Sequence, residues 1–134
     1  MSGQDLYHGV LIAGFGGQGV VLAGKLVATA ALREGREVVW APSYGPEMRG
    51  GAVQCTVIVA TSRIGSPEVT RADSLLTMDQ PSATKLAARV GPGGLLVLNS
   101  TLVKDLAPPE GAEVLAVPAT EAAEARDKSQ DKLP

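Results

Sequence analysis

The sequence contains only one cysteine, Cys55, and one histidine, His8, among its 134 residues. A single cysteine excludes an internal disulfide, and no cluster of cysteines and histidines is present that would form a zinc or iron–sulfur motif. We therefore expect no metal site on this chain and a reducing, cytoplasmic location. Because apolar residues surround Cys55, we expect a small buried core residue there rather than a reactive thiol.

Strong charge and long apolar runs are also missing. The formal net charge is -2, which gives no electrostatic basis for binding nucleic acid or an anionic membrane surface. No apolar run approaches the ~20 residues of a membrane span, and the N-terminus lacks the basic start and apolar core of a signal peptide. With 45% hydrophobic residues the chain can still bury a core, so we expect one soluble domain with neither a nucleic-acid nor a membrane partner.

A glycine-rich turn is the most informative motif that the sequence does contain. Residues 14–19 read Gly-Phe-Gly-Gly-Gln-Gly, directly after the apolar residues 10–13 and at the start of a helical pattern over residues 18–34. In a strand–turn–helix unit this spacing predicts a binding site for an anion, because the first helical amides point at the bound group and the helix dipole favours negative charge there. The candidate ligand-binding residues of the turn are Gly14, Gly16, Gly17, Gln18 and Gly19.

Three glycines of the G-x-G-x-x-G spacing have separate expected roles. We expect Gly14 to permit the sharp turn, Gly16 to let the backbone approach a ligand, and Gly19 to allow close packing of helix on strand. A dinucleotide site would also need a carboxylate at the end of the next strand to bind a ribose, but residues 39–42 read Val-Trp-Ala-Pro. The sequence therefore argues against an independent NAD- or FAD-dependent dehydrogenase.

The hydrophobic pattern predicts an α/β domain, because strand-like apolar stretches alternate with segments of helical periodicity. The strands at 37–41 and 52–60 follow each other without a helix, so we expect a hairpin within a mixed, mostly parallel sheet. We predict a three-layer Rossmann-like domain over residues 1–118 and a charged tail over residues 119–134, either a frayed helix or a disordered segment. The expected strands are 9–13, 37–41, 52–60, 74–78, 95–98 and 113–117, and the expected helices are 18–34 and 82–89.

Further candidate site residues lie outside the glycine turn. Residues 42–51 are expected to form a loop presenting Ser43, Tyr44 and Arg49, whose hydroxyl, phenol and guanidinium groups are suited to a phosphate or a carboxylate. Surface packing, with turns made by the glycines and prolines, explains the same composition equally well. Asn99 ends a predicted strand, where open α/β sheets place ligand contacts, and it is equally suited to a turn.

Taken together, three motifs resemble the gamma subunit of 2-oxoacid:ferredoxin oxidoreductases. They are residues 14–25, residues 42–51 with the sequence Pro-Ser-Tyr-Gly-Pro-Glu-Met-Arg-Gly-Gly, and residues 55–58. Shorter similar stretches follow at residues 66–69, 72–73 and 93–100. The resemblance covers roughly residues 8–118, and its specificity comes from the combination of motifs. The second motif looks more like the 2-oxoglutarate or branched-chain members than like the indolepyruvate enzymes.

The resemblance implies a subunit of an enzyme that oxidatively decarboxylates a 2-oxoacid, forms an acyl-CoA and reduces ferredoxin. In this family of 2-oxoglutarate and pyruvate ferredoxin oxidoreductases, thiamine diphosphate and the iron–sulfur clusters sit mainly on other subunits. The chain is thus expected to bind no cofactor alone and to carry no catalytic residue. Its implied partners are the alpha and beta subunits, in some members a delta subunit, and ferredoxin indirectly. The glycine turn would face a CoA phosphate or a partner subunit, and Ser43, Tyr44 and Arg49 would extend the same wall.

The end of the chain departs from the family pattern. A family member would run on for several tens of residues after Thr120, whereas this sequence becomes charged and stops. We therefore expect either an incomplete subunit, or one whose exposed apolar face is covered by a partner or by a second copy in a homodimer. The competing hypothesis is a free-standing α/β module that binds a phosphorylated ligand or a protein partner without catalysis.

Overall fold

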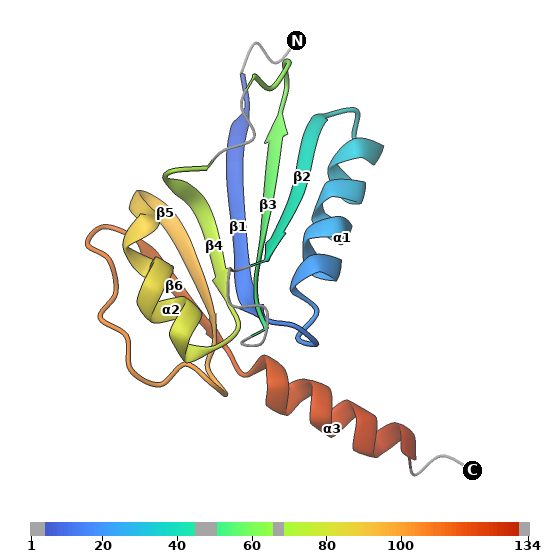
Figure 1. Ribbon diagram of the computed structural model, residues 1–134, viewed down its shortest axis with the longest axis vertical. Helices are drawn as coiled ribbons and strands as arrows, with labels where there is room; N and C mark the ends of the chain where they lie inside the picture. The colour runs from blue at the N-terminus through green and yellow to red at the C-terminus, as the bar shows by residue number, and fades with distance from the viewer. Residues whose placement is uncertain (1–4, 45–50, 66–68, 132–134) are drawn as a thin grey trace.

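The computed structural model describes residues 5–44, 51–65 and 69–131. Its elements follow in chain order as β1 (Tyr7–Phe15), α1 (Val20–Arg33), β2 (Glu37–Tyr44), β3 (Ala52–Ala60), β4 (Ala72–Thr77), α2 (Gln80–Leu86), a 3-10 turn (Ala87–Arg89), β5 (Val90–Asn99), β6 (Glu113–Val117) and α3 (Ala119–Asp131). Every strand and helix expected from the hydrophobic pattern is present, and β3 and β6 have their predicted bounds. The α/β class with a mixed, mostly parallel sheet is confirmed (Figure 1).

The six strands form one sheet in the order β2-β3-β1-β4-β5-β6. β1, β4, β5 and β6 run parallel to one another, whereas β3 lies antiparallel to both of its neighbours. β3 has this direction because it returns from β2 as the predicted hairpin, with Val38 opposite Val59. The parallel strands bring their carboxyl ends to one edge of the sheet, which is where open α/β sheets hold ligands.

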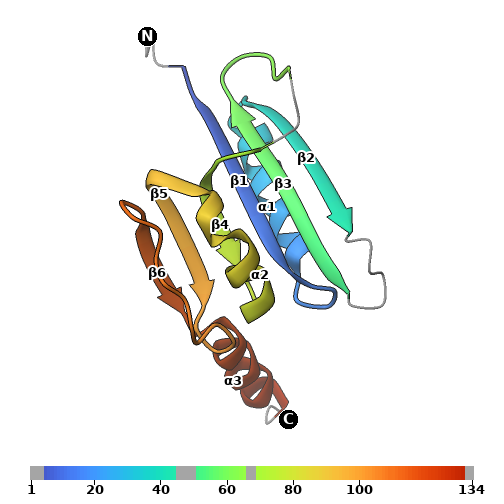
Figure 2. The ribbon, with the colours of Figure 1, turned by 60° about the vertical axis from the view of Figure 1, so that its left-hand side comes forward.

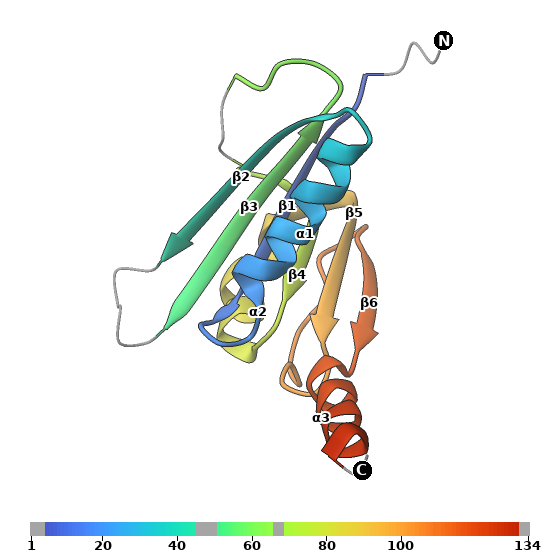
Figure 3. The ribbon, with the colours of Figure 1, turned by 90° about the vertical axis from the view of Figure 1, so that its right-hand side faces the viewer.

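Helices cover the two faces of the sheet separately, which makes three layers. α1 packs across β1, β2 and β3 on one face (Figure 3), and α2 packs on the opposite face over β1 and β4 (Figure 2). Side chains alternate along β1, so that Ile12 belongs to the core under α1 and Leu11 to the core under α2. Val57 of β3 and Leu96 of β5, both fully buried, extend these two cores.

Small residues on α1 allow the helix to approach the sheet closely. The buried positions of α1 are Val20, Gly24, Ala28 and Ala31. A Cβ atom on Gly24 would overlap Sγ of Cys55 in β3 and would lie 3.2 Å from Nε1 of Trp40 in β2. Only glycine leaves room for these two side chains, so Gly24 sets the distance between α1 and the hairpin.

The expected loop at residues 42–51 begins later than predicted. β2 continues through Pro42 to Tyr44 in regular pairing with β3. The prediction that Pro42 ends this strand is wrong, because β2 is an edge strand and one side of its backbone needs no partner in the ladder. Ser43 and Tyr44 are therefore strand residues, while residues 45–50 lie outside the described part of the chain.

The charged tail contains a regular helix. Of the two states expected for residues 119–134, the helix is the observed one over Ala119–Asp131. α3 begins just after β6 and projects past the end of the sheet (Figure 1). The division of the chain at residue 118 stays a prediction. None of the described helices is both long enough and apolar enough to cross a membrane.

Among the described residues, the exposed large apolar side chains include those on the outer side of α1 and on the edge strand β6. On the outer side of α1, Leu22 and Leu26 are 60% and 62% exposed. On the edge strand β6, Leu115 is 52% exposed, and α1 does not extend over this end of the sheet (Figure 3). Apolar groups gathered on a surface in this way are typical of regions that another protein covers.

Candidate functional site

The glycine turn joins the carboxyl end of β1 to the N-terminus of α1, as the sequence predicts. Its left-handed positions are Gly17 (φ 89°) and Gly19 (φ 80°), which glycine adopts without strain. The prediction that Gly14 permits the turn is wrong, because Gly14 still belongs to β1. A Cβ atom on Gly14 would lie 2.5 Å from Oε1 of Gln18 and 2.8 Å from Cβ of Met78, so glycine serves close packing there. The packing role expected of Gly19 is also wrong, since nothing lies within 4 Å of its Cβ position.

Hydrogen bonds from the backbone and from one side chain hold this turn. The Phe15 amide donates to Oε1 of Gln18 over 2.7 Å, and the Gln18 amide donates to the Phe15 carbonyl over 3.2 Å. The Gly16 amide donates to the Gly51 carbonyl over 2.6 Å, which ties the turn to the residue before β3. Gln18 therefore fixes the shape of the turn, a role that its place in the motif did not reveal.

The N-terminus of α1 is open to a negatively charged group. Gly19 is the N-cap residue and offers no side-chain acceptor to the first amides, and the first turn of the helix contains no acidic residue. The Ala23 amide donates to the Gly19 carbonyl over 2.8 Å, so the amides of residues 20–22 precede the first bond within the helix. Together with the helix dipole, these amides favour an anion beside the turn.

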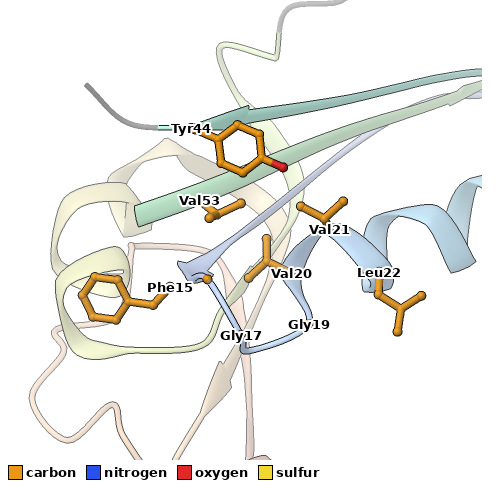
Figure 4. Close-up of a pocket in the computed structure, with 9 residues that line it drawn as sticks. Phe15, Gly17, Gly19, Val20, Val21, Leu22, Tyr44 and Val53 are labelled. Carbon is orange, nitrogen blue, oxygen red and sulfur yellow. The ribbon is translucent and has the colours of Figure 1, made fainter. Parts of the chain in front are cut away.

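A cavity of about 420 Å³ lies against this end of α1. Besides glycines of the turn, its walls are Phe15, Val20, Val21, Leu22, Tyr44 and Val53. In Figure 4, Tyr44 of β2, Val53 of β3 and Val20 of α1 lie in the middle of the group. Phe15 and Leu22 lie at its opposite ends. The site therefore combines a positive helix end with apolar walls. This combination suits a ligand with an anionic part and an apolar part, or an apolar side chain of another protein.

The remaining predicted site residues do not gather at this cavity. Tyr44 lines it, whereas Ser43 lines a different cavity on the α2 side of the sheet, because neighbouring residues of a strand point to opposite faces. These two side chains thus do not form one wall. The predicted ligand role of Ser43 stays a prediction, and Arg49 lies outside the described residues.

Asn99 lies at the end of β5, and its amide group is fully engaged within the chain. Nδ2 donates to the Met78 carbonyl over 3.0 Å and to the Thr120 hydroxyl over 2.9 Å. Oδ1 accepts from the amides of Ala119 and Thr120 over 3.0 and 3.3 Å. The side chain is 1% exposed, so it fastens the start of α3 to β4 and β5 from inside the fold. A contact between Asn99 and a ligand stays a prediction.

A second cavity, of about 300 Å³, lies between the glycine turn and α3. Gly17 and Gln18 form one side of this cavity, and Met78 and Leu102 add apolar surface. The helix α3 contributes Ala119, Thr120, Ala123, Glu124 and Asp127. Sequence reasoning missed these α3 residues, because the composition of the tail indicates only solvated charge and nothing in the sequence shows that the helix returns beside the turn.

The single cysteine belongs to the core, as predicted. Cys55 is fully buried in β3, and burial raises the pKa of its thiol, while a hydrogen bond with Trp40 acts in the opposite direction. The thiol is therefore protonated at neutral pH and is a packing group. Within the part of the chain that the structure describes, no three His, Cys, Asp or Glu side chains gather as a metal-binding group.

The family of the chain follows from its match to known proteins. The pyruvate ferredoxin/flavodoxin oxidoreductase family matches residues 9–131, a range that includes the glycine turn and α3. The chain therefore belongs to this family, which confirms the resemblance carried by the motifs.

Individual relatives agree with this assignment. The chain is 46% identical over 114 residues to the ketoisovalerate oxidoreductase subunit VorA of Methanothermobacter marburgensis, covering 85% of this chain and 24% of the relative. It is 36% identical over 102 residues to the 2-oxoglutarate synthase subunit KorC of Methanocaldococcus jannaschii, covering 75% of this chain and 54% of the relative. The gamma subunit of a keto/oxoacid ferredoxin oxidoreductase from Geobacter sulfurreducens PCA superposes with a TM-score of 0.72 at 35% identity, over 87% of this chain and 64% of that one. The chain thus spans only part of the length of each relative.

Proposed function

We propose that the chain is the gamma subunit of a 2-oxoacid:ferredoxin oxidoreductase. The complex oxidatively decarboxylates a 2-oxoacid, transfers the acyl group to CoA and passes the electrons to ferredoxin. The observation that carries this proposal is the family match over residues 9–131, and the fold shared with a gamma subunit supports it. The relatives named for ketoisovalerate and 2-oxoglutarate favour a branched-chain oxoacid or 2-oxoglutarate as the substrate.

In this proposal the redox chemistry belongs to the other subunits. The alpha and beta subunits, with a delta subunit where one exists, hold the thiamine diphosphate and the iron–sulfur clusters. The sequence supports this division because its single cysteine is buried in the core and no set of cysteines is available for a cluster. The contribution of this chain is to bind: it closes the CoA site and docks on the core subunits.

We assign the CoA contact to the cavity beside the glycine turn. The uncapped amides of residues 20–22 are suited to a phosphate, and Gly16, Gly17 and Gly19 keep the approach free of side chains. The apolar walls, with Tyr44 as their most exposed member, are suited to the less polar part of the same molecule. In this proposal the helix amides contact a phosphate of CoA, and the apolar walls of the same cavity contact a less polar part of CoA.

Replacing Tyr44 with serine is expected to raise the KM for CoA of the assembled enzyme about fivefold and to leave kcat nearly unchanged. The ring is a wall of the binding site and not a reacting group, and an aromatic contact is worth about 1 kcal/mol. Initial rates at varied CoA concentration measure the effect. Tyr44→Phe retains the ring and should retain the KM.

Tyr7→Ser is the matched control for this experiment, because Tyr7 is a similarly exposed tyrosine at the opposite end of β1 from the glycine turn. It should leave the KM for CoA unchanged. A Tyr44→Ser enzyme with the parental KM would show that CoA is bound elsewhere.

The exposed leucines of α1 are the proposed docking face for the core subunits. Leu22 and Leu26 are four residues apart, so both project from one side of the helix, away from the sheet. Leu22 also lines the glycine-turn cavity, which places the docking face directly beside the proposed CoA site. A partner that covers these leucines would therefore complete that site.

The variant Leu22→Asp/Leu26→Asp is expected to reduce recovery of the other subunits with a tagged chain by at least tenfold, because two charges would be buried without partners. Its thermal unfolding midpoint should stay at the parental value, since both side chains are more than half exposed. Leu32→Asp is the control: Leu32 is 60% exposed but lies on another side of α1. Undiminished co-purification of the double variant would exclude this face.

A further inference from the structure

The sheet face opposite α1 carries a polar cavity of about 350 Å³, separate from the glycine turn. Its polar lining comes from Ser43 of β2, Gln54 and Thr56 of β3, Thr70 before β4, and Arg89 after α2. Figure 2 shows this face toward the viewer, with α2 beside the β2–β3 hairpin rather than over it. The hairpin therefore presents a polar surface on a part of this face that α2 does not cover.

The register of the hairpin explains why these polar side chains converge. Ser43 pairs directly with Gln54, and Ala41 pairs with Thr56, so Ser43, Gln54 and Thr56 project from the same face of two adjacent strands. No hydrogen bond joins any of these three side chains to another residue that the structure describes. Such hydroxyl and amide groups are suited to donate hydrogen bonds to a bound molecule.

Arg89 supplies the positive charge of this cavity. Its Nε donates to the Thr70 carbonyl over 3.3 Å, and its Nη2 donates to the Val69 carbonyl, so the guanidinium is held in one orientation. These two bonds leave both N–H groups of Nη1 without a described partner. Arg89 is half-buried, and among the described residues no carboxylate lines the cavity and no acid forms an ion pair with Arg89. A half-buried guanidinium favours an anion beside it.

We propose that this cavity binds an oxyanion, the phosphate or carboxylate group of a small molecule, with Arg89 as the charged donor and Ser43, Gln54 and Thr56 as the neutral donors. The proposal goes beyond the CoA site proposed above, because the two cavities lie on opposite faces of the sheet. It also gives Ser43 a ligand role on a face that sequence reasoning did not foresee. The oxyanion sits over the β2–β3 hairpin rather than at the end of a helix.

The test is a titration of the isotope-labelled 134-residue chain with inorganic phosphate, and separately with acetate, followed by amide chemical shifts at constant ionic strength. We expect saturable shifts centred on Thr56 and Thr70. Arg89→Gln should weaken the binding at least tenfold, and Thr56→Val, which keeps the shape of the side chain, about threefold to fivefold. Lys25→Gln removes an exposed positive charge of α1, on the opposite face of the sheet, and should leave the affinity unchanged. Tighter binding of phosphate or of acetate identifies the preferred oxyanion.

Several results would overturn the proposal. They are the absence of saturable shifts, equal affinity in Thr56→Val and the parent, or shifts centred on residues 17–22, which would place the anion at the glycine turn instead. Arg89→Gln could fail to fold, because Arg89 also donates to two backbone carbonyls. In that case the affinities of Thr56→Val and Ser43→Ala for the oxyanion test the proposal. The titration needs no partner subunit, so its failure is distinct from a failure of the proposed oxidoreductase role.

Discussion

Replacing Gly24 with valine is expected to lower the free energy of unfolding by about 3 kcal/mol, which corresponds to a fall of roughly 10 °C in the unfolding midpoint. The packed interior between α1 and the hairpin has no space for the added side chain. Its Cβ atom alone would overlap Sγ of Cys55 and approach Nε1 of Trp40 to 3.2 Å, and Cys55 is fully buried in β3. Relief would require α1 to move away from the hairpin, which opens the core on that face of the sheet.

A smaller substitution isolates the contact responsible. Gly24→Ala gains about 1 kcal/mol of helix propensity, yet it should still be less stable than the parent by about 1 kcal/mol, because the overlap with Cys55 outweighs that gain. In a Cys55→Ala background the same change should cost nothing or stabilise, because the sulfur is gone. Urea unfolding of the four proteins in this cycle measures the coupling.

Gly65→Ala is the control for glycine replacement, since Gly65 is exposed and nothing lies within 4 Å of its Cβ position. It should change stability by no more than about 0.5 kcal/mol. A Gly24→Val protein as stable as the parent would mean that α1 does not pack on Cys55 as described.

Replacing Asn99 with alanine is expected to cost about 3 kcal/mol of stability. The buried amide makes four hydrogen bonds, to Met78, to Ala119 and twice to Thr120. Each is worth about 1 kcal/mol, and the Met78 carbonyl is left without this donor in the interior. Because three of the four bonds reach α3, the loss should appear first as faster amide exchange in α3 and then as a lower global stability.

Thr101→Ala is the matched control, because the exposed Thr101 hydroxyl also accepts a bond from α3, from the Glu121 amide over 3.2 Å. It should cost less than about 1 kcal/mol. Urea unfolding and hydrogen exchange measure both losses. Equal losses in Asn99→Ala and Thr101→Ala would contradict the conclusion that Asn99 is the main attachment of α3 to the sheet.

The regular elements were predictable because their periodicity is strong. The alternation in Ala52–Ala60 gave β3 its correct bounds, and the absence of a helix before it predicted the hairpin. Pro42 was misleading, because its missing N–H group ends a central strand but is tolerated at an edge, and edge position is a property of the whole sheet.

The composition of the site was easier to predict than its geometry. The spacing of glycines located the turn correctly, but the roles of Gly14 and Gly19 depend on backbone angles and on distant side chains such as Met78. Likewise, Ser43 and Tyr44 are adjacent in sequence but lie on opposite faces once the strand continues through them. The pairing of strands far apart in the sequence decides which face a side chain occupies and which distant side chains it contacts. The local sequence does not encode this pairing.

We propose that this chain works as a subunit of a 2-oxoacid:ferredoxin oxidoreductase, and its recovery from native cells is the decisive experiment. A tagged chain is captured from its native cells, and the recovered material is assayed for reduction of a low-potential dye that depends on both a 2-oxoacid and CoA. If the chain is such a subunit, we expect co-purifying subunits with thiamine diphosphate and iron–sulfur clusters, and activity with 2-oxoglutarate or a branched-chain oxoacid. Recovery of the chain alone and inactive would argue against this role and would favour a free-standing binding module.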